Sequence, residues 1–170
     1  LDDEWWTSPD GLRWERPARG VNALDVFPQI PRLETHPMIA HGMILFPRGK
    51  LLLGLPEDRL SFVGARANGE FSTRAFKMPA AGLLLNAAVP SPDRPFAKEQ
   101  AYIMAAVLDE KGAVIPGFGA DRCVVRDADR QAMPLQWGEA SARQLAGRTV
   151  RLRFWLRSAN IYAVTTPVEP

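Results

Sequence analysis

The stretch "GRTVRLRFWLRSANIYAV" (residues 147–164) has the most regular pattern in the chain. From Val150 to Arg157 apolar and polar side chains alternate, which predicts a β-strand because successive side chains leave a strand on opposite sides. One face is apolar and consists of Val150, Leu152, Phe154 and Leu156. The opposite face consists of Arg151, Arg153, Trp155 and Arg157. This second face needs a functional or structural explanation.

The four residues "RSAN" (157–160) interrupt that alternation and carry polar side chains. They predict a tight turn, since Ser and Asn form local hydrogen bonds that favour turns. Residues 149–157 and 160–166 are therefore expected to pair as a hairpin.

The rest of the chain has short apolar or alternating runs between its 15 prolines and 13 glycines. Further strands are expected at residues 38–46, 50–55, 59–66, 70–78, 82–89, 101–109, 113–118 and 132–137. Many short strands separated by turn residues are typical of a sandwich or a barrel. We predict an all-β fold, an antiparallel β-sandwich of the jelly-roll or concanavalin A-like kind.

Three local features refine this prediction. Residues 98–112 contain strong helix formers, but a strand is favoured because the run ends in the turn "DEKG" (109–112), where Gly112 can adopt positive φ. One short helix is expected at residues 141–147, with Ser141 as its cap and Gly147 at its end. Residues 15–37 contain four prolines and are interpreted as an extended connection.

The composition is that of a soluble globular protein. The 21 Lys and Arg exceed the 19 Asp and Glu by only two and are scattered, which argues against a nucleic-acid surface. The apolar runs are too short to span a bilayer, so no membrane partner is expected. The first residues, "LDDEWW", lack a starting Met and resemble no signal peptide, so we expect the chain to be cut or processed from something longer. The compartment is left open.

No catalytic constellation is evident from the sequence. Cys123 is the only cysteine, which excludes a disulfide within the chain. It is interpreted as a buried structural thiol. His36 and His41 would face opposite sides of one strand, which argues against a shared metal site. The loop "ADRCVVRDADRQ" carries Asp121, Asp127 and Asp129, a weak candidate for a calcium site. Interleaved arginines make local ion pairing the plainer account, and no cofactor is expected.

The five tryptophans are the remaining candidates for ligand contact. Trp5, Trp6 and Trp14 lie near the N-terminus, whereas Trp137 ends an apolar strand and is assigned to the core. A flat aromatic ring can stack on a sugar, but Trp also packs well as a large hydrophobic residue. Trp155 is expected to be exposed or covered by something outside the first core layer. The sequence is consistent with either role for these rings.

Two parts of the chain resemble a known family. "TSPDGLRWERP" (7–17) resembles the Ser/Thr-x-Asp-Gly-x-x-Trp blade motif of five-bladed β-propellers of the glycoside hydrolase family 32 and 43 type. Ser8, Asp10, Gly11 and Trp14 hold the motif positions. Three blocks, residues 59–89, 105–123 and 135–164, resemble in order and spacing the β-sandwich that follows the propeller in family 32-like proteins, including uncharacterised bacterial ones.

The resemblance implies two segments with different roles. Residues 1–56 would be a final propeller blade plus linker, and residues 57–170 the β-sandwich domain. The chain departs from the pattern because it has room for one blade only and carries an insertion at residues 90–100. The family's catalytic carboxylates belong to blades absent here, so no residue inherits that role.

Three functions are consistent with these observations. The first is a non-catalytic accessory domain of a sugar-active protein, with the rest of a propeller or a second subunit as its partner. The second is an independent carbohydrate-binding module. The third is an enzyme with an undetected site at the Asp-rich loop. For the first two, the candidate contact residues are Trp5, Trp6, Trp14, Arg151, Arg153, Trp155 and Arg157.

Overall fold

The computed structural model describes residues 38–48, 51–56, 58–59, 62–90 and 100–167. The chain divides after Glu57 into two compact units. The boundary predicted from the sequence lies one residue earlier, after Pro56.

The first unit contains a three-stranded antiparallel sheet in the order β1-β2-β3. Its strands are β1 (Met38–Ala40), β2 (Met43–Arg48) and β3 (Leu51–Pro56). The single strand expected at residues 38–46 is wrong, because His41 and Gly42 form a two-residue turn between β1 and β2. Their φ values are +53° and +70°, the left-handed conformation that such tight hairpins need.

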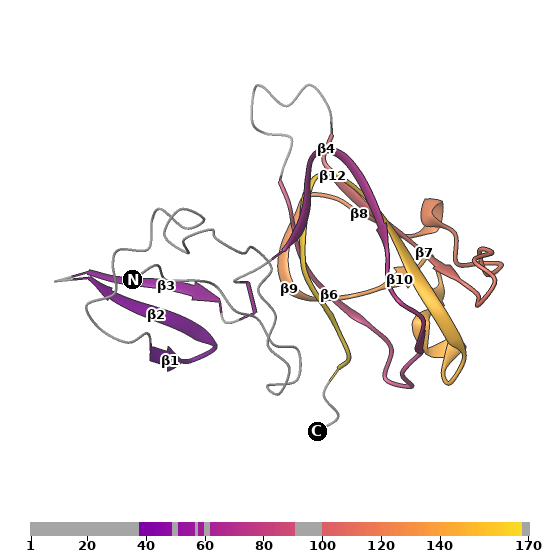
Figure 1. The fold of residues 1–170 in the computed structure, drawn as a ribbon, viewed down its shortest axis with the longest axis horizontal. Helices are drawn as coiled ribbons and strands as arrows, with labels where there is room; N and C mark the ends of the chain where they lie inside the picture. The colour runs from indigo at the N-terminus through magenta and orange to yellow at the C-terminus, as the bar shows by residue number, and fades with distance from the viewer. Residues whose placement is uncertain (1–37, 49–50, 57, 60–61, 91–99, 168–170) are drawn as a thin grey trace. The chain divides into compact units, whose positions relative to one another are not determined.

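The second unit is an all-β antiparallel structure whose main sheet curls on itself, in agreement with the predicted β-sandwich class (Figure 1). The sheet contains β4 (Val63–Ser72), β5 (Phe76–Lys77), β6 (Leu84–Val89), β7 (Tyr102–Leu108), β8 (Val124–Val125), β9 (Ala128–Pro134) and β12 (Thr149–Thr165). A separate pair is formed by β10 (Gln136–Trp137) and β11 (Ala140–Ser141). Two short 3-10 helices are η1 (Ala120–Arg122) and η2 (Ala142–Leu145).

Strand β12 organises this sheet because it pairs along both edges. One edge pairs with β5 and β4. The other edge pairs with β7 over residues 151–157 and then with β6 over residues 160–165. Strand β8 extends the sheet from β7, and β9 extends it from β6. Strand β12 therefore connects β4 and β5, along one edge, with β7 and β6 along the other (Figure 1).

The turn expected at residues 157–160 is wrong. Strand β12 runs through this segment, and the pairing with β4 shifts register between Arg157 and Ala159. Ser158 has φ +47° and its hydroxyl donates to the carbonyl of Arg66. A β-bulge places one extra residue in a strand and bends it. The polar residues thus bend a continuous strand instead of reversing the chain.

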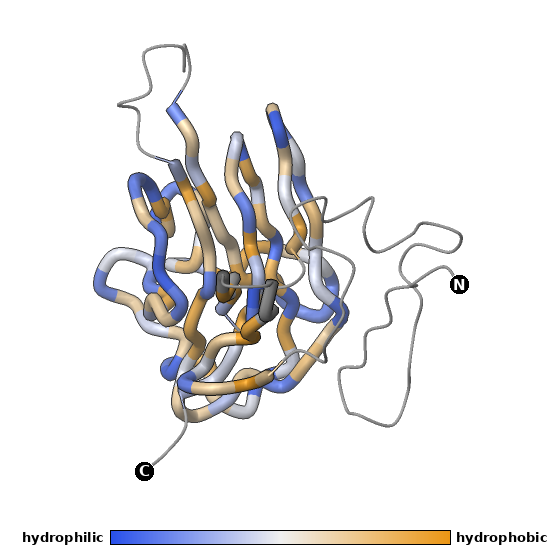
Figure 2. The backbone as a smooth tube through the Cα atoms, turned by 90° about the vertical axis from the view of Figure 1, so that its left-hand side faces the viewer, coloured by the Kyte–Doolittle hydropathy of each residue, from blue (hydrophilic) through white to orange (hydrophobic). Residues whose placement is uncertain are grey.

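The core lies on the inner side of the curled sheet, and polar and apolar residues alternate along its strands (Figure 2). Val150, Leu152, Phe154 and Leu156 are all at most 2% exposed, which confirms the apolar face of β12. After the bulge, Ala159 and Ile161 continue the buried face. Trp137 is fully buried, as predicted, and its Nε1 donates to the carbonyl of Ala105 at 2.7 Å.

Two further local predictions are confirmed. The segment after β7 turns at Asp109–Gly112, where the Asp109 carboxylate accepts from the amides of Lys111 and Ala113 and Gly112 has φ +84°. The expected short helix is η2, whose cap Ser141 accepts from the Arg143 amide.

The strand expected at residues 113–118 is reduced to one bridge between Leu108 and Val114.

Candidate functional site

The best-placed candidate residues lie on the outer face of β12. Because the inner face is apolar and buried, Arg151, Arg153, Trp155 and Arg157 project to the outside, as the alternation predicts. Arg151 is exposed, whereas the other three side chains are half-buried. The strand therefore holds these four groups on one surface at regular spacing.

Neighbouring strands extend this surface on both sides. Residues directly opposite in an antiparallel pair project from the same face. Trp155 faces Met104 of β7 on one edge and Glu70 of β4 on the other, and Met104 in turn faces Val124 of β8. Arg157 lies between Tyr102 of β7 and Asn68 of β4. We call the surface formed by Asn68, Glu70, Tyr102, Met104, Val124, Arg151, Arg153, Trp155 and Arg157 the outer β12 face.

Arg153 links two side chains of this face. Its Nη2 lies 2.9 Å from Glu70 Oε1, and its guanidinium carbon lies 5.1 Å from the centre of the Trp155 ring. The arginine and glutamate side chains are 41% and 53% exposed, so the ion pair contributes less than about 1 kcal/mol. The guanidinium nevertheless occupies the space over one side of the Trp155 ring. That side of the ring is not open for stacking in this conformation.

Two residues of β7 that project to the same side as the outer β12 face are buried, although they do not belong to the hydrophobic core. Ala106 and Leu108, opposite Arg153 and Arg151, are 1% and 6% exposed. Long arginine side chains can cover apolar surface while their charged ends stay in water. The outer β12 face is thus a partly apolar layer and differs from a purely solvated strand face.

The other candidates are not assembled into a site. Trp5, Trp6 and Trp14 lie outside the described residues, as does His36. Asp121 lies in η1, Asp127 precedes β9 with φ +47°, and Asp129 in β9 forms an ion pair with Arg59. Among the residues that the structure describes, no group of three His, Cys, Asp or Glu is placed to hold a metal ion.

Cys123 is buried, as expected from the sequence. Burial raises the pKa of its thiol from 9.0 to about 11, and the backbone hydrogen bonds of Ala105 and Gln136 oppose this shift to a smaller extent. The thiol is therefore protonated at neutral pH and is a poor nucleophile.

We expect native Cys123 to react with iodoacetamide at pH 8 roughly 100-fold more slowly than in the unfolded chain, because far less thiolate is present. Mass spectrometry of timed samples measures both rates, and equal rates would contradict the assignment. Since the folded-state pKa is raised, the contribution of this thiol to stability is complete below pH 9 and is lost as the pH rises toward about 11. A Cys123→Ala variant should lose less stability over this interval than the parent chain.

A groove of about 570 Å³ is lined by residues of β5 and by the last residues of β12. Its lining residues are Thr73, Phe76, Lys77, Pro79, Leu83, Leu152, Val164, Thr165 and Thr166. This lining is mainly apolar, and Lys77 is its one charged member. The groove includes none of the site residues predicted from the sequence.

Comparisons with family models, curated proteins and solved structures found no match for this chain. Within the described part, no helix is long and apolar enough to cross a membrane.

One polar cluster was missed by the sequence analysis. Asn86 contacts the adjacent residues Asp58 and Arg59, and Gln131 also contacts Asp58, although at least 27 positions separate the partners of each contact. The available signal was Asn86 itself, a polar residue inside the apolar run "LLLNAAV" (83–89). A buried polar side chain requires hydrogen-bond partners, but the sequence does not say which residues supply them.

Proposed function

We propose that residues 57–170 are a non-catalytic accessory β-sandwich of a sugar-active, propeller-type protein. In this proposal the outer β12 face packs against the remainder of that protein or against a second subunit. The observation that carries the proposal is the half-buried Trp155, held beside Arg153 and next to Met104. The resemblance of residues 59–164 to family 32-like sandwich domains supplies the parent class.

The composition of the outer β12 face favours a protein partner. Aromatic residues, Met and Arg are enriched in protein interfaces, and Trp, Tyr and Arg dominate their energetic hot spots. Tyr102, Met104, Trp155 and Arg153 occupy adjacent positions of this face. Val124 lies at its edge and is 40% exposed. Covering this surface would remove its exposed apolar groups from water.

An independent carbohydrate-binding module is the second candidate. The observation that favours it is the proximity of Trp155 to the charged groups of Arg153 and Glu70, since sugar sites combine a ring with polar partners. Against it, the guanidinium of Arg153 lies over one side of the ring. Sugar stacking on that side would require Arg153 to move away.

A Trp155→Ala variant of the full chain distinguishes the two candidates. We expect sedimentation at 1–100 μM to show self-association of the parent chain and at least roughly tenfold weaker association of the variant, the size expected for an interface hot spot. Phe62→Ala is the matched control, because Phe62 is an aromatic residue that is 57% exposed outside this face.

Calorimetric titration with a panel of oligosaccharides at millimolar concentration completes the comparison. The accessory-domain proposal predicts no heat of binding with either protein. If the parent chain binds an oligosaccharide and the folded variant does not, the carbohydrate-binding module becomes the favoured function. A parent chain that is monomeric throughout, with tryptophan fluorescence showing solvated Trp155, would count against the packing face.

A further inference from the structure

Strand β6 lies between two irregularities of the sheet, and both occur next to Asn86. On one side, β12 has the extra residue Tyr162 between Ile161 and Ala163, which face Ala87 and Asn86. On the other side, the pairing with β9 shifts register between Leu85 and Ala87. There Gln131 and Ala132 of β9 stand opposite Asn86 alone. Bulges re-aim side chains and recur beside functional positions.

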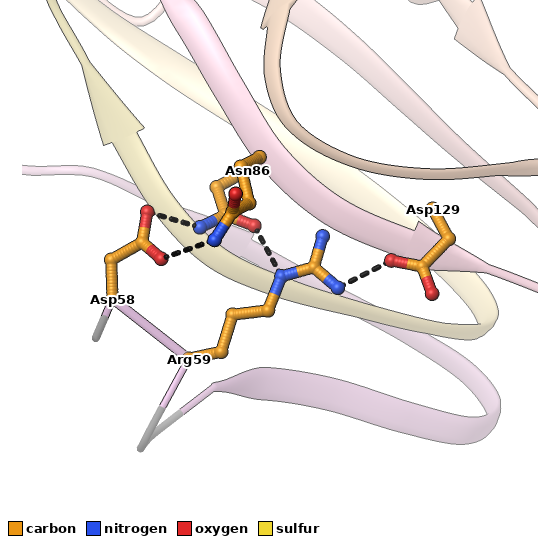
Figure 3. A network of polar contacts seen from close by, with 5 residues as sticks. Asp58, Arg59, Asn86 and Asp129 are labelled. Atoms are coloured by element: carbon orange, nitrogen blue, oxygen red, sulfur yellow. Dashed lines mark hydrogen bonds and ion pairs between the residues drawn. The ribbon is translucent and has the colours of Figure 1, made fainter. Parts of the chain in front are cut away.

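Three residues at these irregularities, Asn86, Gln131 and Tyr162, contact one short segment, Asp58–Arg59. Asn86 Nδ2 donates to Asp58 Oδ2 at 2.6 Å, and Asn86 Oδ1 accepts from Arg59 Nε at 3.0 Å (Figure 3). Gln131 Nε2 donates to the other carboxylate oxygen of Asp58 at 3.2 Å. Both ends of the Asn86 amide thus bind two consecutive residues of the chain.

Arg59 makes two additional contacts. Its Nη1 forms an ion pair and hydrogen bond with Asp129 Oδ1 (Figure 3). Its guanidinium carbon lies 4.7 Å from the centre of the Tyr162 ring. The Arg59 side chain is only 14% exposed, although that of Asp129 is 70% exposed. The planar guanidinium therefore uses its Nε, its Nη1 and its face at the same time, which a lysine ammonium cannot do.

Asn86 is the one buried polar side chain among the described residues, at 1% exposed. A buried amide without partners would destabilise the fold, so its two hydrogen bonds account for its presence in an apolar strand. Asp58 and Arg59 themselves lie outside the described strands. Their side-chain contacts, and not pairing within a sheet ladder, connect them to the sheet.

We propose that Asn86, Asp129, Gln131 and Tyr162 form a docking site on the sandwich for the dipeptide Asp58–Arg59. We call this set of contacts the junction latch. Asp58 is the first residue of the second unit, so all contacts of the latch lie within that unit. The ligand class is specific: a carboxylate followed directly by a guanidinium. This inference is independent of the proposed function of the outer β12 face.

Limited trypsin digestion of the full chain tests the latch directly, because trypsin must take the Arg59 side chain into its own binding pocket. We expect the bond between residues 59 and 60 to be cut at least roughly tenfold faster in Arg59→Lys, Asp129→Ala and Asn86→Ala than in the parent chain. Arg59→Lys is the sharpest variant, since it keeps the charge and remains a trypsin site. Asp121→Ala, which removes an exposed carboxylate elsewhere, should leave this rate unchanged.

Mass spectrometry separates latch release from general destabilisation. Cleavage after Lys77 and Arg148, measured in the same digests, should keep its parental rate while cleavage after residue 59 rises. If Asn86→Ala accelerates every cut, the test rests on Arg59→Lys, which keeps the charge, and on Asp129→Ala, which changes an exposed side chain. Unchanged cleavage after residue 59 in those two variants, or a uniform rise at all sites, would overturn the proposal.

Discussion

Phe154→Asp is expected to abolish cooperative folding of the sandwich. Phe154 is fully buried on the apolar face of β12 and stacks on Phe71, with ring centres 5.2 Å apart. The substitution removes about 1.5–3 kcal/mol of apolar burial. It also places a carboxylate among apolar side chains, which costs several kcal/mol more. The sum is comparable to the total stability of a typical domain, about 5–15 kcal/mol.

The neighbouring residue provides the control. Trp155→Asp introduces the same carboxylate one position later, but on the outer β12 face and within reach of Arg153. We expect this variant to stay folded and to lose about 1–2 kcal/mol, as is usual for single substitutions. Circular dichroism and urea unfolding measure both effects. A folded Phe154→Asp protein, or equal losses in the two variants, would contradict the assignment of the two faces.

Trp137→Ala is expected to reduce the free energy of unfolding by about 3–5 kcal/mol, the range for large aromatic residues truncated in a core. Trp137 is fully buried, and its ring centre lies 5.4 Å from that of Phe118. The loss combines a cavity with an unpaired carbonyl at Ala105, whose partner is the indole Nε1 at 2.7 Å.

Two variants separate these contributions. Trp137→Phe keeps most of the apolar volume but removes the indole donor, so we expect an intermediate loss of about 1–3 kcal/mol. Trp155→Ala truncates the same residue type on the outer face and should cost less than Trp137→Ala. Denaturant unfolding followed by circular dichroism provides the comparison. Equal losses of unfolding free energy for Trp137→Ala and Trp155→Ala would contradict the assignment of Trp137 to the core and of Trp155 to the outer β12 face.

The candidate site was partly predictable. The outer position of Arg151, Arg153, Trp155 and Arg157 followed from a strict alternation of residue types, since that pattern has one stable arrangement beside an apolar core. The partners Glu70 and Met104 were not predictable. They lie 85 and 51 positions from Trp155 along the chain, and only strand register brings them together.

The junction latch illustrates the same limit. Its members come from β6, β9, β12 and the segment before β4, and each is an ordinary polar residue in its local sequence. Bulges at Tyr162 and opposite Asn86 aim them at one point. A bulge depends on the register of the partner strand and therefore leaves no clear local pattern.

Local patterns alone were sufficient for the β class, the two faces of β12, the Asp109–Gly112 turn and the burial of Trp137. These features depend on residues that are close together in the sequence and on the burial of apolar side chains, so the order of consecutive residues predicts them. The roles of Ser158 and His41 depended on the three-dimensional fold. A polar residue with positive φ suits either a turn or a bulge, and pairing with distant strands selects between them. Ser158 bends one continuous strand because β12 pairs with β4 and with β6 along its two edges. His41 and Gly42 reverse the chain because β1 pairs with β2.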